Sequence, residues 1–261
     1  MKQRTLTGVV LALLSMVLLG CFHLSWVPQL IAILLGCGAV WEILGANGIK
    51  NKGSYAAGLF LAVIIPLFSL TEKVWWMAAA LVLGLGFFTY LMTRIGKQAP
   101  AWVVAPEIVL ALCLYRGLAC YGEIPHGAFF LCLTGLICAL TDIFAYLVGS
   151  RFGRHKLAPK VSPGKSIEGA LGGLGITVVL IVLVFGRFFD DIGTLVLYTA
   201  VVSILGQFGD LSMSAVKRVA GVKDFGHIFP GHGGILDRCD SLMYPLAFTW
   251  LLYCAQIWIF V

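Results

Sequence analysis

The chain consists largely of apolar stretches that are long enough to cross a lipid bilayer. A helix needs about 20 predominantly apolar residues to span the hydrocarbon core, and about nine stretches approach or reach this length. Hydrophobic residues make up 60% of the 261 residues, charged residues only 11%, and the mean hydropathy is +0.98, which is outside the range of soluble domains. The sequence therefore predicts an all-α, polytopic integral membrane protein. The predicted spans are residues 5–22, 27–46, 55–71, 75–93, 101–120, 127–149, 169–187, 193–213 and 241–260.

The first stretch has a second interpretation. The basic residues before position 5 and the apolar run that ends at Cys21 resemble a secretory signal with a lipoprotein-type cysteine. We favour a first membrane helix, because the later spans already anchor the chain and make cleavage superfluous.

The basic residues test this topology independently, because cytoplasmic loops of membrane proteins carry an excess of Lys and Arg. With the N-terminus inside, the inner segments hold all 18 Lys and Arg residues except Lys73, Arg116 and Arg187. This predicts a cytoplasmic N-terminus, a multi-pass protein of the cell (inner) membrane, and an active site on the cytoplasmic side. The net charge of +6 arises from short loops rather than from one basic patch, so nucleic acid is not an expected partner.

Two inner segments are much longer than the other connections, at residues 150–168 and 214–240. No internal repeat or linker marks a second domain. We therefore expect a single membrane domain in which residues 1–126 form N-terminal scaffold helices and residues 127–261 form the catalytic region. The eight cysteines fall mostly within apolar runs and never in CxxC spacing, which argues against a zinc site or a disulfide framework.

Four carboxylates from three predicted spans converge on the inner boundary. Asp142 lies about 10 Å inside that boundary at 1.5 Å per residue, and Asp210, Asp237 and Asp240 lie close to it. Ionisable residues within lipid mark functional sites by default, and hard oxygen ligands from several elements suit Mg²⁺ or Ca²⁺. The alternative is that each carboxylate pairs with a nearby cation. Glu42 and Glu107 also lie within spans, but a structural role is as plausible for them, so they are left outside the site.

The two long inner segments supply cations and glycines beside these carboxylates. In the first, Lys165 stands next to Glu168 at a predicted helix start, where it is positioned to hold a phosphate; Pro159 stands where a P-loop requires glycine. In the second, basic and acidic residues alternate around a glycine-flanked histidine. This combination of groups is typical of a phosphoryl-transfer site. The residues concerned are Ser214, Lys217, Arg218, Lys223, Asp224, His232, Gly233, Gly234 and Arg238.

These residues together resemble the phosphatidate cytidylyltransferase family, the CDP-diacylglycerol synthases. The family signature is matched across positions 214–240, and the blocks around Thr141-Asp142, Ser162–Gly169 and Gly209-Asp210 resemble other parts of the family pattern. The resemblance covers roughly the C-terminal half of the chain. Cys239, Met213 and Gly164 depart from residues that are common in the family, whereas the core carboxylates do not.

The resemblance implies transfer of a cytidylyl group from CTP to phosphatidate in the bilayer, which gives CDP-diacylglycerol and pyrophosphate and depends on Mg²⁺. Asp142, Asp210, Asp237 and Asp240 would hold one or two metal ions and, with Lys217 and Arg238, form the catalytic set. The substrate-binding set would be Lys165, Glu168, Ser214, Arg218, Lys223, Asp224, His232, Gly233 and Gly234.

Two alternatives remain open at this point. The substrate of a cytidylyltransferase of this kind could be another lipid phosphate. Intramembrane carboxylates also serve cation-coupled transporters, although such sites favour the bilayer midplane between repeats. The sequence leaves the oligomeric state open, a homodimer included.

Overall fold

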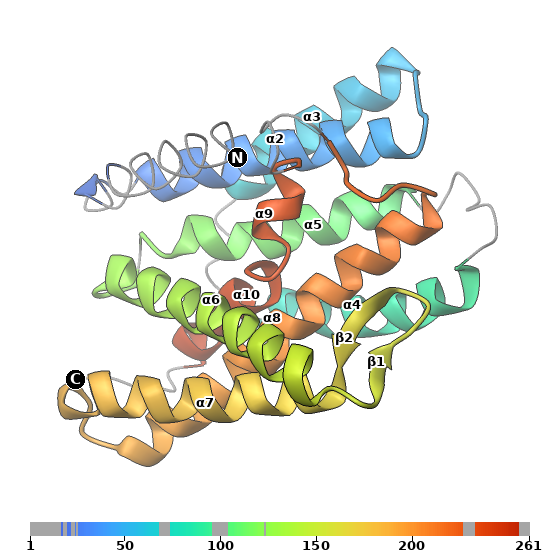
Figure 1. The fold of residues 1–261 in the computed structure, drawn as a ribbon. Helices are drawn as coiled ribbons and strands as arrows, with labels where there is room; N and C mark the ends of the chain where they lie inside the picture. Colours follow the sequence, from blue (N-terminus) through green and yellow to red (C-terminus); the bar gives the residue numbers. More distant parts are fainter. Residues whose placement is uncertain are drawn as a thin grey trace.

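The computed structural model describes residues 17, 20–21, 24, 26–67, 74–95, 104–122, 124–226 and 233–255 (Figure 1). The predicted span 5–22 falls almost entirely outside these ranges, and so does His232. The elements are α2 (Trp26–Ala46), α3 (Lys52–Leu67), α4 (Val74–Arg94), α5 (Val104–Cys120), α6 (Gly127–Phe152), β1 (Lys156–Ala158), β2 (Ser162–Ser166), α7 (Ile167–Phe185), η2 (Gly186–Phe188), α8 (Ile192–Val219), α9 (Leu236–Cys239) and α10 (Met243–Cys254).

Each predicted span after the first overlaps a helix in the part of it that the structure describes, which bears out the mainly helical fold. Within the described ranges, four helices are long and apolar enough to cross a membrane, namely α2, α6, α7 with its η2 extension, and α8. α3, the Leu81–Arg94 part of α4, and α10 are shorter apolar helices. The total of nine spans and the cytoplasmic N-terminus stay predictions.

The end of α8 differs from the prediction, because the helix continues beyond residue 213 to Val219. The charged residues that follow position 213 indicated an exit from the span, but Val216 and Val219 on the same turns are buried in the core, and this burial extends the helix. Gly221 then ends it with a φ of +75°, while Val222 N donates to Lys217 O at 2.9 Å. This is a Schellman-type helix end, and it places Ser214, Lys217 and Arg218 on a helix rather than in a loop.

A short β-hairpin occupies the predicted inner loop between α6 and α7. β1 and β2 pair antiparallel, with Lys156 opposite Ser166. Ser166 then caps α7, since its hydroxyl accepts a hydrogen bond from Gly169 N at 3.1 Å. The hairpin lies beside the C-terminal half of α8 (Figure 1). Arg218 Nε on α8 donates a hydrogen bond to Val161 O in the turn of the hairpin at 3.1 Å.

Glycines allow α6 and α7 to pack along each other. A Cβ atom at Gly169 would lie 2.6 Å from Ala145 O, and one at Gly173 would lie 2.7 Å from Thr141 O. Larger residues would push the two backbones apart, as in the small-residue interfaces of membrane helices. The close packing fixes the hairpin over the C-terminal end of α6.

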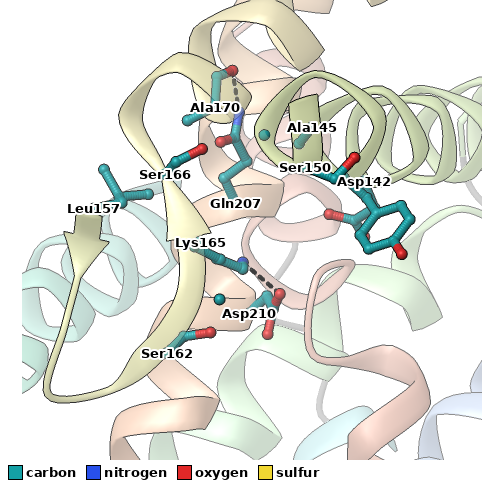
Figure 2. A pocket seen from close by; sticks show the side chains of 13 residues that line it. Asp142, Ala145, Ser150, Leu157, Ser162, Lys165, Ser166, Ala170, Gln207 and Asp210 are labelled. Carbon is teal, nitrogen blue, oxygen red and sulfur yellow. Dashed lines mark hydrogen bonds and ion pairs between the residues drawn. The ribbon is translucent and has the colours of Figure 1, made fainter. Parts of the chain in front are cut away.

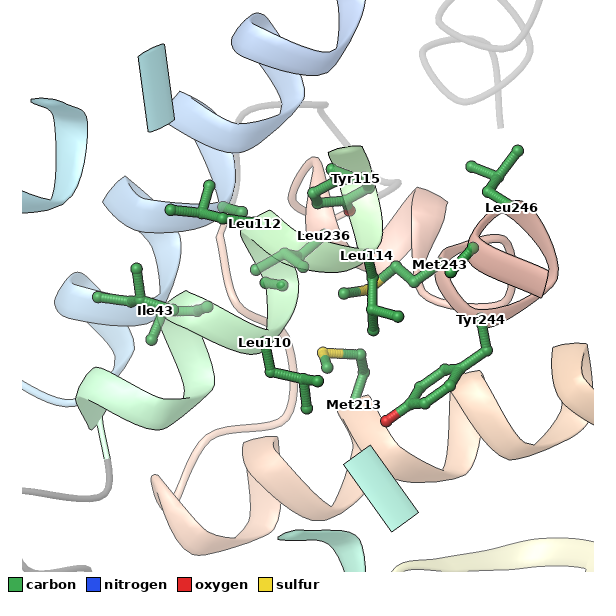
Figure 3. Close-up of a cluster of buried hydrophobic side chains, with 14 of the residues drawn as sticks. Ile43, Leu110, Leu112, Leu114, Tyr115, Met213, Leu236, Met243, Tyr244 and Leu246 are labelled. Carbon is green, nitrogen blue, oxygen red and sulfur yellow. The ribbon is translucent and has the colours of Figure 1, made fainter. Parts of the chain in front are cut away.

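The main core lies between the two halves of the chain (Figure 3). Leu112 and Tyr115 of α5 and Met213 of α8 are buried there with Leu236 and Tyr244. The N-terminal helices therefore pack directly against the elements that carry the carboxylates. On the outer faces of α6, α7 and α8, large apolar side chains are exposed, as expected for surfaces that face lipid.

Candidate active site

A cavity of about 480 Å³ lies between α6, the hairpin, α7 and α8 (Figure 2). Asp142 enters it from α6, Lys165 from β2 and Asp210 from α8. Lys165 Nζ forms an ion pair with Asp210, and Asp142 interacts electrostatically with both of these residues. Ser214 Oγ, one helical turn after Asp210, donates to its Oδ1 at 3.3 Å. The cavity thus brings together carboxylates and a cation from three separate elements.

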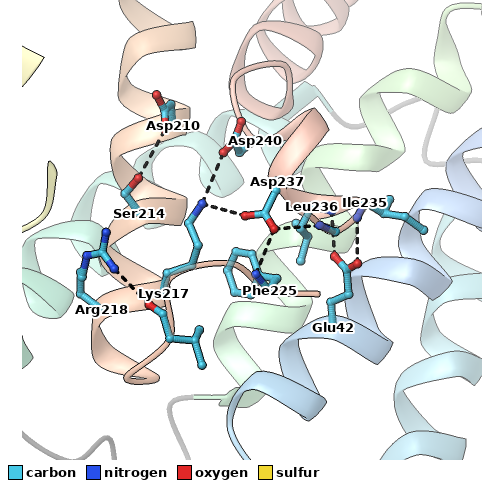
Figure 4. A network of polar contacts seen from close by, with 12 residues as sticks. Glu42, Asp210, Ser214, Lys217, Arg218, Phe225, Ile235, Leu236, Asp237 and Asp240 are labelled. Atoms are coloured by element: carbon cyan, nitrogen blue, oxygen red, sulfur yellow. Dashed lines mark hydrogen bonds and ion pairs between the residues drawn. The ribbon is translucent and has the colours of Figure 1, made fainter. Parts of the chain in front are cut away.

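A second polar cluster lies where α8 meets α9 (Figure 4). Lys217 Nζ contacts Asp237 Oδ1 at 2.8 Å and Asp240 Oδ2 at 3.9 Å. Asp237 lies on α9, and Asp240 is the residue directly after this helix. The residues that flank α9, Ile235 and Asp240, both have helical backbone angles. The three-residue spacing therefore directs both carboxylates at one lysine, even though α10 itself begins only at Met243.

Asp237 also organises the turn that precedes it. Its Oδ2 accepts hydrogen bonds from Phe225 N and Gly234 N, both at 3.0 Å. Gly233 has a φ of +84°, a conformation that strongly favours glycine. Burial opposes ionisation of Asp237, but the hydrogen bonds from Lys217, Gly234 and Phe225 hold the pKa of its carboxyl below the ordinary value. Asp237 is therefore an ionised partner of Lys217.

The two clusters are joined where α8 approaches the α9–α10 connection. A Cβ atom at Gly209 would lie 2.5 Å from Asp240 O, so only a glycine lets the backbones come this close. The approach places Asp240 beside Asp210. Burial, and then the negative charge of Asp210, raise the pKa of Asp240 to about 7, while Lys217 acts in the opposite direction.

The other predicted site residues lie around these clusters. Glu168 binds the start of the hairpin, accepting from Arg154 N at 3.1 Å and contacting His155 Nδ1 at 2.6 Å. Arg218 Nη1 donates to Val222 O at 3.1 Å, so this guanidinium ties the hairpin and the end of α8 together. The side chains of Lys223, Asp224 and Arg238 are exposed, and their contacts with substrate stay predictions.

The donor set suits a hard cation, although among the residues that the structure describes no group of three or more His, Cys, Asp or Glu side chains is placed to hold a metal ion. Mg²⁺ in phosphoryl-transfer sites commonly uses one or two carboxylates and takes its other ligands from substrate phosphates and water. Asp142 and Asp210, with Asp240 beside Asp210, are the carboxylates that could take such a role.

Glu42 is a residue that the sequence analysis left outside the site. It lies on α2, and its two oxygens accept from Ile235 N at 2.8 Å and Leu236 N at 2.9 Å. A glutamate within an apolar span was the available signal, but Glu107 gives the same signal. Nothing in the sequence indicated which of the two glutamates reaches the segment around α9 that carries Asp237 and Asp240, called the carboxylate segment below.

An apolar helical bundle with two carboxylates and a lysine around a cavity, and a second cluster of a lysine with two carboxylates, defines a membrane-type protein with a phosphoryl-transfer site. The comparisons make this specific: the chain belongs to the Cytidylyltransferase family, whose sequence profile matches residues 2–255. The similarity therefore extends over the N-terminal helices, beyond the C-terminal half expected from the motifs.

Several relatives are similar over nearly the full chain. A phosphatidate cytidylyltransferase of Staphylococcus haemolyticus (strain JCSC1435) is 37% identical over 257 residues, which cover 94% of this chain and 96% of the relative. Enzymes with the same name from Staphylococcus epidermidis (strain ATCC 12228 / FDA PCI 1200) and Staphylococcus aureus (strain COL) are 36% and 35% identical, again over 94% of this chain and 96% of each relative.

Proposed function

We propose that this protein transfers a cytidylyl group from CTP to phosphatidate, giving CDP-diacylglycerol and pyrophosphate. The observation that carries the proposal is the Asp142–Lys165–Asp210 arrangement around the cavity, in a chain whose near full-length relatives are named for this reaction. In the reaction, a phosphate oxygen of phosphatidate attacks the α-phosphorus of CTP, and the bond between the α-phosphorus and the bridging oxygen breaks. Pyrophosphate leaves with that oxygen and its electron pair.

The residues of the chain position charged groups and need not form a covalent intermediate. Lys165 and Lys217 lie in the two clusters and are placed to neutralise phosphate oxygens as point charges. Fixed cations of this kind stabilise the charge that builds up on the transferred group and the leaving group. Ser214 orients Asp210 through its hydrogen bond, while Asp237 fixes both Lys217 and the turn at Gly234.

We also propose that the protein uses Mg²⁺. Asp142, Asp210 and Asp240 are the preferred ligands, because the carboxylate of Asp237 already accepts three hydrogen bonds. When bound, one or two ions would supply further neutralisation of the triphosphate. The excess of basic residues in alternate loops supports a site at the cytoplasmic face of the cell membrane.

The test is turnover by the purified protein in detergent. CTP and phosphatidate are supplied with and without Mg²⁺, and both pyrophosphate and the lipid product are measured; Asp210→Asn serves as the inactive control. Mg²⁺-dependent formation of both products in equal amounts is the expected result. A second arm offers polyprenyl phosphate and an ether-linked lipid phosphate in place of phosphatidate. Product from one of these alone would reassign the lipid substrate, and no product with any lipid or divalent ion would overturn the proposal.

A further inference from the structure

Glu42 connects the N-terminal helices to the segment that carries two of the site carboxylates. Its side chain is buried, with only 3% of the residue exposed. Its carboxyl group faces the start of α9, where it accepts one hydrogen bond at each oxygen from Ile235 N and Leu236 N (Figure 4). The contact joins residues that are 193 and 194 positions apart in the chain.

The backbone of the carboxylate segment is packed tightly around this carboxyl group. A Cβ atom at Gly234 would lie 2.3 Å from Glu42 Oε1, and one at Gly226 would lie 2.7 Å from the same atom. Gly38, one helical turn before Glu42, likewise leaves room for Ile235, whose Cδ1 would lie 2.5 Å from a Cβ there. The fit on both sides shows that α2 and the segment are shaped for each other at this point.

α9 depends on such an external acceptor. It has only four residues, too few for a helix to be stable by itself. The first N–H groups of any helix lack partners within the helix, and those of Ile235 and Leu236 are satisfied by Glu42. Asp237 follows directly, and Asp240 lies one turn further on, so the position of both carboxylates depends on where α9 begins.

Gly234 lies between two acidic side chains. Its N–H donates to Asp237 Oδ2, while Glu42 packs against its other side. The segment is thus fixed by one carboxylate of its own and by one from the N-terminal half. Loss of either acceptor would leave buried N–H groups unsatisfied, which the segment can relieve only by moving.

We propose that Glu42 is a positioning residue for the active site: it anchors the start of α9 to α2 and thereby sets the positions of Asp237 and Asp240. This inference rests on the proposed function for its kinetic consequences, but the anchoring itself does not. Glu42 holds the backbone and acts on the chemistry through the two aspartates.

Glu107 provides a matched control. It is as buried as Glu42, at 2% exposed, and it lies on the neighbouring helix α5. Its carboxyl group accepts from Asn47 Nδ2 at 3.3 Å rather than from the carboxylate segment. Glu42→Gln and Glu107→Gln therefore make the same substitution at two equally buried positions, and only the first turns an N–H₂ group towards a backbone N–H at α9.

The experiment compares wild type, Glu42→Gln, Glu107→Gln and Gly226→Ala as full-length proteins in detergent. Hydrogen–deuterium exchange is followed in peptides that cover residues 233–241, and melting temperature and steady-state kinetics are measured on the same samples. Gly226→Ala leaves Glu42 in place and disturbs the contact from the opposite side, so it keeps the test available if Glu42→Gln does not fold.

The expected result is faster exchange of residues 233–241 in Glu42→Gln and Gly226→Ala than in wild type and Glu107→Gln. If the two aspartates are misplaced, kcat should fall about 10- to 100-fold and the Mg²⁺ concentration for half-maximal rate should rise. A smaller fraction of folded molecules would instead lower the rate and leave that Mg²⁺ concentration unchanged. Exchange and kinetics that match the Glu107→Gln control would overturn the inference. Wild-type protein that makes no product from CTP and phosphatidate would instead overturn the proposed function, and the exchange comparison would still decide the anchoring.

Discussion

Gly209 offers a sharp test of how the two clusters cooperate. Gly209→Ala should favour the helix, since alanine is about 1 kcal/mol better than glycine within one. At this position, however, the new Cβ would lie 2.5 Å from Asp240 O, whereas ordinary contacts begin at 3.4 Å. A backbone oxygen cannot rotate away, so α8 and the α9–α10 connection have to separate by about 1 Å in a closely packed interior. Asp240 would then move away from Asp210.

A shift of this size in a catalytic group lowers turnover about 100-fold. We therefore expect Gly209→Ala to lose about two orders of magnitude in kcat/KM for CTP, measured as CDP-diacylglycerol formed per folded molecule. Gly175→Ala is the matched control, because it introduces the same helix-favouring change on α7 with no atom within 4 Å of the new Cβ. Activity of Gly209→Ala within twofold of Gly175→Ala would show that the approach of Asp240 to α8 is not required.

Three further predictions concern the charges. Because the pKa of Asp240 is raised to about 7, protons compete with Mg²⁺ for its carboxylate near and below that pH. The half-saturating Mg²⁺ concentration should rise about fivefold from pH 7 to pH 6 and change little from pH 8 to pH 9, and equal values at pH 6 and pH 8 would contradict the assignment. Lys217→Met removes the partner of the carboxylate of Asp237, whose side chain is only 4% exposed. The free energy of unfolding should therefore fall by about 3–5 kcal/mol, and a melting temperature near that of wild type would argue against this pairing. Lys165→Met breaks the ion pair with Asp210, in which each side chain is about a quarter exposed. The free energy of unfolding should change by less than about 1 kcal/mol, while kcat/KM for CTP falls about 100-fold. A large drop in melting temperature with normal kinetics would instead make Lys165 a structural residue.

The helices could be predicted from sequence because their signal is local. Length and hydropathy locate a span, whereas its end depends on contacts. Lys217 and Arg218 indicated that α8 had left the membrane, yet burial of Val216 and Val219 continues the helix. The hairpin was not predictable either, because Ser162–Ser166 contains Pro163 and shows no apolar alternation that would indicate a strand.

The four aspartates could be predicted as a group because Asp142 and Asp210 lie near the same ends of their predicted spans, while Asp237 and Asp240 come directly before the last span. Their pairing could not. Lys165 and Asp210 are 45 positions apart in numbering and meet only because the hairpin folds back onto α8. The sequence predicted that cations and carboxylates share one end of the molecule, and the structure shows which of them are in contact.

Glu42 and Glu107 mark the limit of that reasoning. Both are lone glutamates in apolar helices, and by composition they are equivalent. The difference lies in their partners, since Glu107 meets a side chain, whereas Glu42 meets backbone N–H groups of Ile235 and Leu236. Every residue except proline carries a backbone N–H group. The residues whose N–H groups bind Glu42 therefore show no sequence pattern that would reveal the contact. A motif therefore identifies the carboxylates of this site, but the residue that positions them becomes visible only in the fold.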